Sequence, residues 1–263
     1  VAAFHVPLAD VAAVVPRPHA PPVGPCSGYH GLPATDDGFR YPVAHPRFLY
    51  LLPKSLLYHL SGDLMARSLQ SWYDQTEQTA DVFHGCHVYP DGYGLLDLAR
   101  THSRPLPAYA HGTIINEFET FNGGTQRRIR QTLRETDTVF CSGTQIAEAI
   151  HALEPTASTR VVPIGATPAH FPVERTDTLR QELQVPDDAT VVLFCGRFSE
   201  AKGIADLLDV LPDLDDLYFV FVGHGGDYRE SIRQTLAGDE TPAGTVQWKL
   251  SPVAVRRWFA VAD

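Results

Sequence analysis

The sequence VVLFCGRFSEAKGIADLLDVL, residues 191–211, joins an apolar run to an amphipathic stretch through a short polar loop. The first part is apolar without alternation, which is typical of a strand buried on both faces. The second part repeats leucine and isoleucine at helical spacing. The loop between them holds two glycines and two cations: Gly196, Arg197, Lys202 and Gly203. This order predicts one strand–helix unit of a parallel sheet.

Strand-like and helix-like segments alternate from about Asp137 to the end of the sequence. The apolar runs are TVFCS (138–142), RVVPI (160–164), TVVLFC (190–195), LYFVFVG (217–223) and TVQW (245–248). Amphipathic helices are predicted from Thr144, through Leu179, from Ile204, around Ile232 and from Pro252. Together they predict an α/β protein with parallel sheets that helices cover on both faces.

The first half of the sequence is less regular. Strands are predicted in VAAVVPRP (11–18), DVFHGCH (81–87) and PLPAYAHG (105–112), and helices around Leu56, Leu60, Leu64 and Leu69 and in LLDLAR (95–100). The segment PIGATPAHFP (163–172) contains three prolines and reads as a hinge. We therefore expect an N-terminal Rossmann-like domain in residues 1–165, a hinge in 166–175 and a second domain in 176–263.

The composition narrows the class of protein. The chain has 263 residues and a formal net charge of -10, which argues against nucleic acid as the main partner. Only three of its cationic side chains are lysine. An acidic, lysine-poor composition is typical of proteins from high-salt cells, and high-GC codon usage also favours arginine over lysine. The four cysteines lie far apart, which favours free thiols in a reducing compartment. No apolar run is long enough to cross a bilayer, and we expect a cytoplasmic protein.

Several blocks occur in the order and at the spacing of a known family. They are DVFHGCHVYPDGYGLLDLA, RPLPAYAHGTIINEF, TDTVFCSGTQIAEAI, RVVPIGATPAHFPV, the opening stretch 191–211, and LYFVFVGHGGDY. Over nearly its whole length the chain resembles the family 4 glycosyltransferases. These are retaining enzymes of the GT-B class, in which two Rossmann-like domains with parallel sheets face a cleft. The chain starts at Val1 without a methionine and stops inside a helix, so we interpret it as cut at both ends, with an incomplete second domain.

The resemblance implies a site for the donor diphosphate at Gly196, Arg197 and Lys202. Rossmann-like domains bind ligands outside the carboxyl ends of their strands, and glycines let backbone amides approach a phosphate. Two cations there stabilise the charge that grows on a departing nucleoside diphosphate. The structural alternative is a solvated loop whose charges serve solubility. In the family, Gly223 and Gly225 close a turn beside the nucleotide, and the segment from Val246 through Lys249 meets the nucleobase.

The resemblance also implies that His111, at the end of a strand, lies in the cleft beside the donor sugar. A neutral imidazole can donate or accept a hydrogen bond there without acting as a base. The alternative is a strand-end histidine that backbone groups satisfy. Relatives often carry an acidic residue shortly after the glycine, where this chain has Ile114 and Ile115. A metal site at His84, Cys86 and His87 is disfavoured, because on a strand His87 points away from the other two.

The function predicted from the resemblance is transfer of a hexose, with retention, from a nucleotide diphosphate sugar to a glycan or a lipid-linked glycan. Neither a metal nor another cofactor is expected. The basic helix TQRRIRQTLRE (125–135) reads as a solvated face, and it leaves open a peripheral contact with an anionic lipid at the inner face of the membrane. A nucleotide-sugar epimerase of the same fold and a non-catalytic remnant are the alternatives. Relatives hold the donor sugar with glutamates that would lie beyond Asp263, so we expect these 263 residues alone to be inactive.

Overall fold

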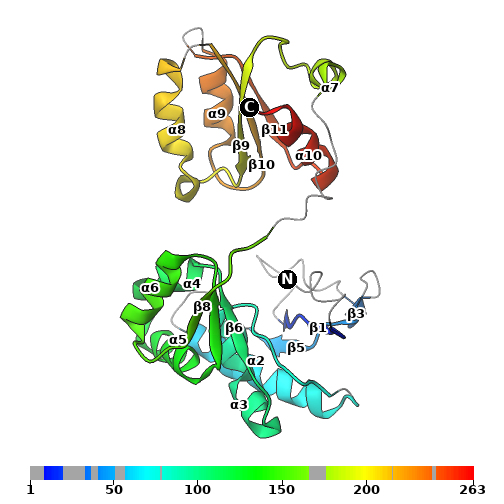
Figure 1. The fold of residues 1–263 in the computed structure, drawn as a ribbon, viewed down its shortest axis with the longest axis vertical. Coiled ribbons are helices and arrows are strands. Elements are labelled where there is room, and N and C mark those ends of the chain that lie inside the picture. The colour runs from blue at the N-terminus through cyan, green and yellow to red at the C-terminus, as the bar shows by residue number, and fades with distance from the viewer. Residues whose placement is uncertain are drawn as a thin grey trace. The chain divides into compact units, whose positions relative to one another are not determined.

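The computed structural model describes residues 9–19, 33–36, 41–50, 57–77, 79–165, 176–214, 216–238 and 241–263. The chain forms two compact units, Val1–Ile164 and Gly165–Asp263, and each is described by itself (Figure 1). The hinge predicted in residues 166–175 lies outside the described residues, as does Leu56 of the predicted first helix.

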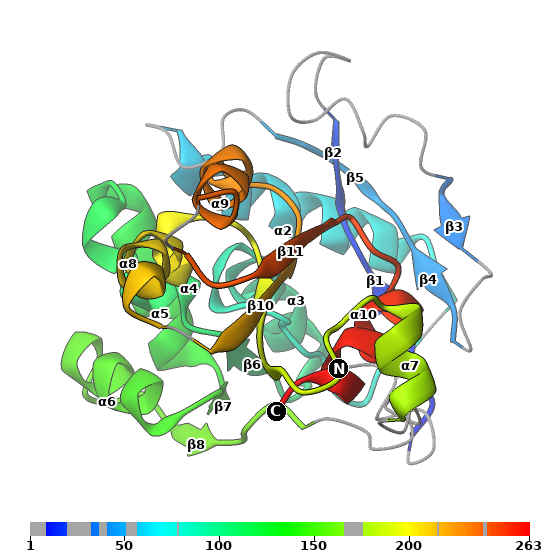
Figure 2. The ribbon, with the colours of Figure 1, turned by 90° about the horizontal axis from the view of Figure 1, so that it is seen from above.

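The second unit is built on a parallel sheet with the strand order β11–β10–β9. Its strands are β9 (Thr190–Gly196), β10 (Leu217–Gly223) and β11 (Gly244–Trp248). Its helices are α7 (Asp177–Glu182), α8 (Ile204–Val210), α9 (Arg229–Leu236) and α10 (Pro252–Val261). Helices α8 and α9 lie on one side of the sheet and α7 and α10 on the other, as both views show (Figures 1 and 2). The elements predicted for this half are therefore confirmed.

The central strand β10 explains why both faces of this sheet are covered. Phe219 and Phe221 point to the side of α8 and α9, where they pack in one cluster with Ile232. Val220 and Val222 point to the opposite side, where they pack in another cluster with residues of α7 and α10. All four strand side chains are buried, and each contributes roughly 1.5–3 kcal/mol when it leaves water.

The first unit contains a second parallel sheet with the order β6–β7–β8. Its strands are β6 (Pro107–Ala110), β7 (Thr138–Cys141) and β8 (Thr159–Val161). The α-helices in the described residues of this unit are α2 (Tyr58–Asp74), α3 (Tyr93–His102), α4 (Thr113–Asn116), α5 (Gly123–Glu135) and α6 (Thr144–Leu153). Buried residues of α5, α6 and β7 form one core cluster, in which Ile129, Leu133 and Ile150 are fully enclosed.

The strand predicted in residues 81–87 is wrong. This segment makes one parallel bridge to the sheet, between Gly85 and Ala108. The chain then turns through Val88–Gly92, where the backbone N–H of Gly92 donates to the carbonyl of His87 (2.8 Å). The turn passes so close to the bridge that a β-carbon at Gly85 would lie 2.8 Å from the α-carbon of Gly92. Before the turn, the backbone N–H groups of Phe83 and Gly85 donate to the carbonyls of Pro105 and Pro107 (3.0 Å each), and the turn ends this pairing after Gly85.

Short strands near the N-terminus complete the described part of the first unit. They are β1 (Ala13–Val14), β2 (Arg17–His19), β3 (Thr35–Asp36), β4 (Val43–Ala44) and β5 (Arg47–Leu49), arranged as β1–β4–β3 and β2–β5. The single strand predicted in 11–18 is therefore two. The predicted helix is α2, in which Leu69 is buried and Leu60 and Leu64 are half-buried. The buried face instead centres on Tyr58, Ser61, Gly62 and Met65.

Candidate functional site

The carboxyl ends of three parallel strands meet at one edge of the second unit. Gly196, Gly223 and Trp248 are in register at the ends of β9, β10 and β11. Ligands of open parallel sheets bind outside this edge. Val246 lies two residues before the end of β11, paired with Phe221, and its side chain packs against the core.

Glycines allow the loops after β9 and β10 to touch each other. A β-carbon at Gly223 would lie 2.0 Å from the carbonyl oxygen of Gly196 and 2.6 Å from the ring of Phe198. Gly226 has a φ of +79°, and a β-carbon there would lie 1.8 Å from the carbonyl oxygen of Phe198. The backbone N–H of Phe198 donates to the carbonyl of Gly225 (3.2 Å). The two loops are thus fixed against each other, and this rigidity positions the side chains that they carry.

Two exposed cations extend from the loop after β9. The Arg197 side chain runs alongside Gly225, whose added β-carbon would lie 3.8 Å from both Cγ and Nε of the arginine. Lys202 ends a short 3-10 turn, and Gly203 then adopts a φ of 72° to begin α8. Neither cation forms an ion pair with any residue that the structure describes. The same loop also carries one carboxylate, that of Glu200.

The loop after β11 is tied to the same edge. Lys249 has a φ of 55°, and its backbone N–H donates to the carbonyl of Gly223 (3.0 Å). The guanidinium of Arg229, at the start of α9, lies 4.6 Å from the centre of the Trp248 ring. The sequence reasoning missed this pair, whose signal is an aromatic residue at a strand end and an arginine at the start of the preceding helix. Lys249 and Arg229 add two more cations to the edge where Arg197 and Lys202 lie.

The first unit carries a histidine cluster at the carboxyl end of its own sheet. His111 directly follows β6, as predicted, and is exposed. Its ring lies 4.5 Å from that of Tyr109 and 5.1 Å from that of His87, measured between ring centres. His87 Nδ1 lies 2.9 Å from a carboxylate oxygen of Asp91. Sequence reasoning missed the His87–Asp91 pair, whose signal is a histidine and an aspartate four residues apart across a turn.

These contacts shift the pKa values of the two imidazoles in opposite directions. The hydrogen bond with Asp91 raises the pKa of His87 above its ordinary value. Partial burial, and then the neighbouring charge of His87, lower the pKa of His111. His84, by contrast, turns its ring toward Phe140, with the ring centres 6.3 Å apart. In the described parts of the chain, no three His, Cys, Asp or Glu side chains are placed to share a metal ion.

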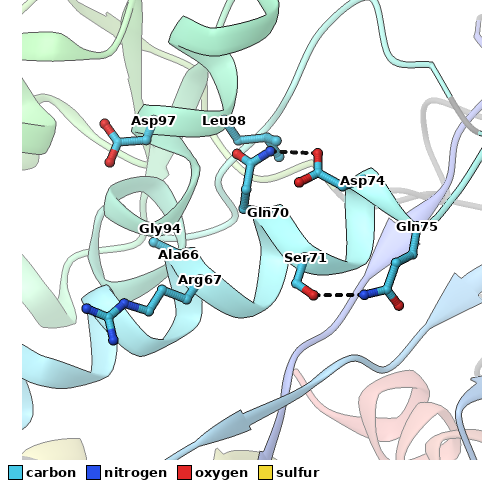
Figure 3. A pocket seen from close by; sticks show the side chains of 9 residues that line it. All are labelled: Ala66, Arg67, Gln70, Ser71, Asp74, Gln75, Gly94, Asp97 and Leu98. Atoms are coloured by element: carbon cyan, nitrogen blue, oxygen red, sulfur yellow. Dashed lines mark hydrogen bonds between the residues drawn. The ribbon is translucent and has the colours of Figure 1, made fainter.

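A hollow of about 520 Å³ lies between α2 and α3 of the first unit (Figure 3). Four of its polar side chains bond in pairs: Gln70 donates to Asp74 (2.8 Å) and Gln75 donates to Ser71 (2.9 Å). None of the residues predicted for a site lines it. The hollow is a groove between two helices rather than a set of groups converging on a ligand.

Comparison with known proteins identifies the family. Residues 13–169, more than half of the chain, match the model of Glycosyltransferase Family 4, and the chain therefore belongs to this family. The match ends before the second unit's sheet, so Arg197 and Lys202 lie outside it. His111, His87 and Asp91 lie within it.

One curated relative is similar over most of the chain. It is the Bacillus subtilis (strain 168) protein named "Putative teichuronic acid biosynthesis glycosyltransferase TuaC", 23% identical over 224 residues. The match covers 82% of this chain and 57% of that protein, so the chain spans little more than half of the relative's length.

Two solved structures show the likeness of fold. Sucrose-phosphate synthase from Thermosynechococcus elongatus matches with a TM-score of 0.76 and 15% identity, over 99% of this chain and 66% of that one. Anabaena Alr3699/HepE, solved with UDP and glucose, matches with a TM-score of 0.62 and 18% identity, over 84% of this chain and 59% of that one. These matches confirm the predicted GT-B class of fold, with a Rossmann-like parallel sheet in each unit. Among the residues described, no helix combines the length and apolarity needed to span a membrane.

Proposed function

We propose that this chain belongs to a retaining glycosyltransferase that transfers a hexose from a nucleotide diphosphate sugar to a hydroxyl of a glycan or a lipid-linked glycan. The observation that carries the proposal is the pair of exposed cations, Arg197 and Lys202, held at the carboxyl edge of the second sheet. Family membership supports the reaction class.

The chemistry of the leaving group explains why these two cations matter. When the bond between the sugar and the diphosphate breaks, negative charge grows on the diphosphate oxygens. Arg197 and Lys202 stabilise that charge more in the transition state than in the ground state, which is the condition for acceleration. Gly196 places no side chain between its backbone and a phosphate, Gly223 lets the ends of β9 and β10 approach each other, and Gly225 and Lys249 shape the turns beside the nucleotide. Because side chains supply the positive charge, we expect turnover without a divalent metal.

The names of similar proteins support the donor and acceptor classes. The Anabaena protein was solved with UDP-glucose as well as with UDP and glucose. A Salmonella typhimurium protein that is 34% identical over 85 residues, 32% of this chain and 19% of that one, is a lipopolysaccharide 1,2-N-acetylglucosaminetransferase. The Bacillus relative is named for teichuronic acid biosynthesis. A nucleotide-sugar donor and a glycan-type acceptor are therefore the classes to test first.

His111 completes the proposal from the first unit. A neutral imidazole at the end of β6 can hydrogen-bond a hydroxyl of the donor sugar near the reacting carbon. Retention then follows a front-side path, in which the departing phosphate itself helps to take the proton of the acceptor hydroxyl.

The test is a transfer assay on the natural protein that contains these residues, with radiolabelled UDP-sugars and GDP-sugars and NMR of the product's anomeric carbon. We expect retained configuration and unchanged turnover after EDTA. Arg197→Ala and Lys202→Ala should each lower kcat at least tenfold, about 1.4 kcal/mol of transition-state stabilisation. The control is Arg233→Ala, an exposed cation in the middle of α9, which should leave kcat unchanged.

Two results would contradict the proposal. An epimerised nucleotide sugar formed without acceptor would establish the epimerase alternative. Absence of turnover with every donor, together with tight nucleotide binding, would indicate a non-catalytic protein.

A further inference from the structure

The bridge between Gly85 and Ala108 brings two histidines together. Because the pairing is parallel, His87 lies two residues beyond the bridge on one segment, and His111 lies three residues beyond it on the other. Both residues leave the sheet at the same edge. Their ring centres are 5.1 Å apart with the planes at 49°. At this distance a positive charge on one ring disfavours a positive charge on the other.

Asp91 favours His87 as the ring that carries the proton. The turn over Val88–Gly92 is closed by the hydrogen bond from Gly92 N–H to the His87 carbonyl (2.8 Å), which fixes the spacing of His87 and Asp91. Their side chains are 53% and 31% exposed, so the 2.9 Å contact lies at the surface of the edge rather than in the core. A carboxylate at this distance stabilises an imidazolium.

The charges around the two histidines do not reverse this order: Asp91 also raises the pKa of His111 directly, but by less than burial and the charge of His87 lower it. Other titratable groups that act on these residues or on their immediate neighbours include Cys86, Tyr58, Tyr109, Glu117 and Cys141. Burial raises the pKa of each of the two cysteines and the two tyrosines, so all four are neutral near pH 7. Glu117 acts on Tyr58. Among the described residues, Asp91 is the carboxylate in contact with His87.

We propose that Asp91 and His87 are positioning residues that keep the ring of His111 neutral at the end of β6. Asp91 stabilises the protonated ring of His87, and the positive charge of that ring disfavours a second proton on His111. The raised pKa of His87 and the lowered pKa of His111 agree with this order. The order of protonation stands on the geometry alone; its part in sugar transfer rests on the proposed function.

The direct test is an NMR titration of the chain with ¹³C-labelled histidine rings, in the wild type, His87→Phe and Asp91→Asn. In the wild type His87 should take up its proton at a higher pH than His111. Phenylalanine removes the charge but keeps a ring at an exposed position, so the affinity of His111 for a proton should rise at least about threefold. In Asp91→Asn, the proton affinity of His87 should fall.

The matched control is His151→Gln, which changes an exposed histidine of α6 that is bonded to Thr159. It should leave the titration of His111 unchanged. The proposal is overturned if His111 protonates first in the wild type, if its titration does not move in His87→Phe, or if that of His87 does not move in Asp91→Asn.

A second readout links the pair to transfer. If transfer needs a neutral His111, the acid limb of the pH–rate profile follows the pKa of His111, and His87→Phe should move that limb to higher pH. A variant that titrates as expected by NMR but leaves the acid limb in place would separate the two claims, because it upholds the protonation order and refutes the role in transfer. Turnover that is absent in all forms bears on the proposed function, while the NMR result still decides the protonation order.

Discussion

Replacing Gly223 with alanine tests how the edge of the second sheet is built. The new β-carbon would lie 2.0 Å from the carbonyl oxygen of Gly196 and 2.6 Å from the ring of Phe198. Both distances are well inside van der Waals contact, and one of the atoms belongs to the backbone of the neighbouring strand. Phe198 is fully buried, so its ring cannot swing into solvent. The ends of β9 and β10 must separate to accept the methyl group.

The expected cost follows from overpacking a close-packed site, which is typically about 1–3 kcal/mol. We expect the upper part of that range, because a backbone carbonyl has to move. For a unit of this size each kcal/mol lowers the melting temperature by about 4–8 °C, so the second unit should melt roughly 10–20 °C lower. Two of the three tryptophans, Trp248 and Trp258, lie in this unit. Tryptophan fluorescence in a Trp72→Phe background therefore reports its unfolding.

The matched control is Gly196→Ala at the end of the adjacent strand. A β-carbon there would have its nearest neighbour, the ring of Phe194, at 3.5 Å, which is an ordinary contact. This variant should stay within about 0.5 kcal/mol of the wild type. A Gly223→Ala protein that melts with the wild type would refute the packing described for this edge.

Two further predictions concern the first unit. Tyr89→Phe removes a hydroxyl that accepts from the buried N–H of Gly62 (3.0 Å) and donates to the carbonyl of Tyr58 (2.7 Å), and loss of these buried hydrogen bonds should cost about 1–3 kcal/mol in urea unfolding; no loss would contradict the contacts. Asp63 is bonded to Arg128 (2.6 and 3.1 Å) and to Tyr93 (3.0 Å). Burial raises the pKa of the Asp63 carboxyl, but these contacts, that of Arg128 above all, outweigh burial and lower the pKa. A lowered pKa in the folded state contributes stability above about pH 4 that is lost as the pH falls through the folded value. Asp63→Asn should therefore cost about 1 kcal/mol near pH 7 and lessen the loss of stability below about pH 4, whereas parallel stability–pH curves would contradict the pair.

Sequence patterns predicted the second unit well because local and tertiary preferences agree there. The strands β9 and β10 are continuous apolar runs, which suits a sheet that helices cover on both faces. In the first unit the apolar pattern of 81–87 also favoured a strand. The chain instead enters a turn that closes at Gly92, and the segment forms a single bridge, at Gly85. The signal for that turn was visible in the residues PDG at 90–92.

The sites show the same division between local and long-range information. Gly196, Arg197 and Gly223 could be placed at a strand edge from sequence, because each follows or ends a recognisable strand. The contact of His87 with His111 depends on the parallel bridge of Gly85 with Ala108, which joins segments that no local pattern connects. Long-range pairing of this kind is fixed by how helices and strands pack, and single-sequence periodicity does not carry it.

The central claim is that Arg197 and Lys202 at the edge of the second sheet bind a nucleoside diphosphate, and isothermal titration calorimetry of the chain with UDP and GDP tests it most directly. We predict saturable binding of at least one of the two nucleotides, weakened by added salt because the contacts are exposed. Arg197→Ala and Lys202→Ala should each weaken that binding about tenfold or more, since a hydrogen bond to a charged group contributes about 1.5–3 kcal/mol. Binding of equal strength in the wild type and both variants, or no binding of either nucleotide, would contradict the account.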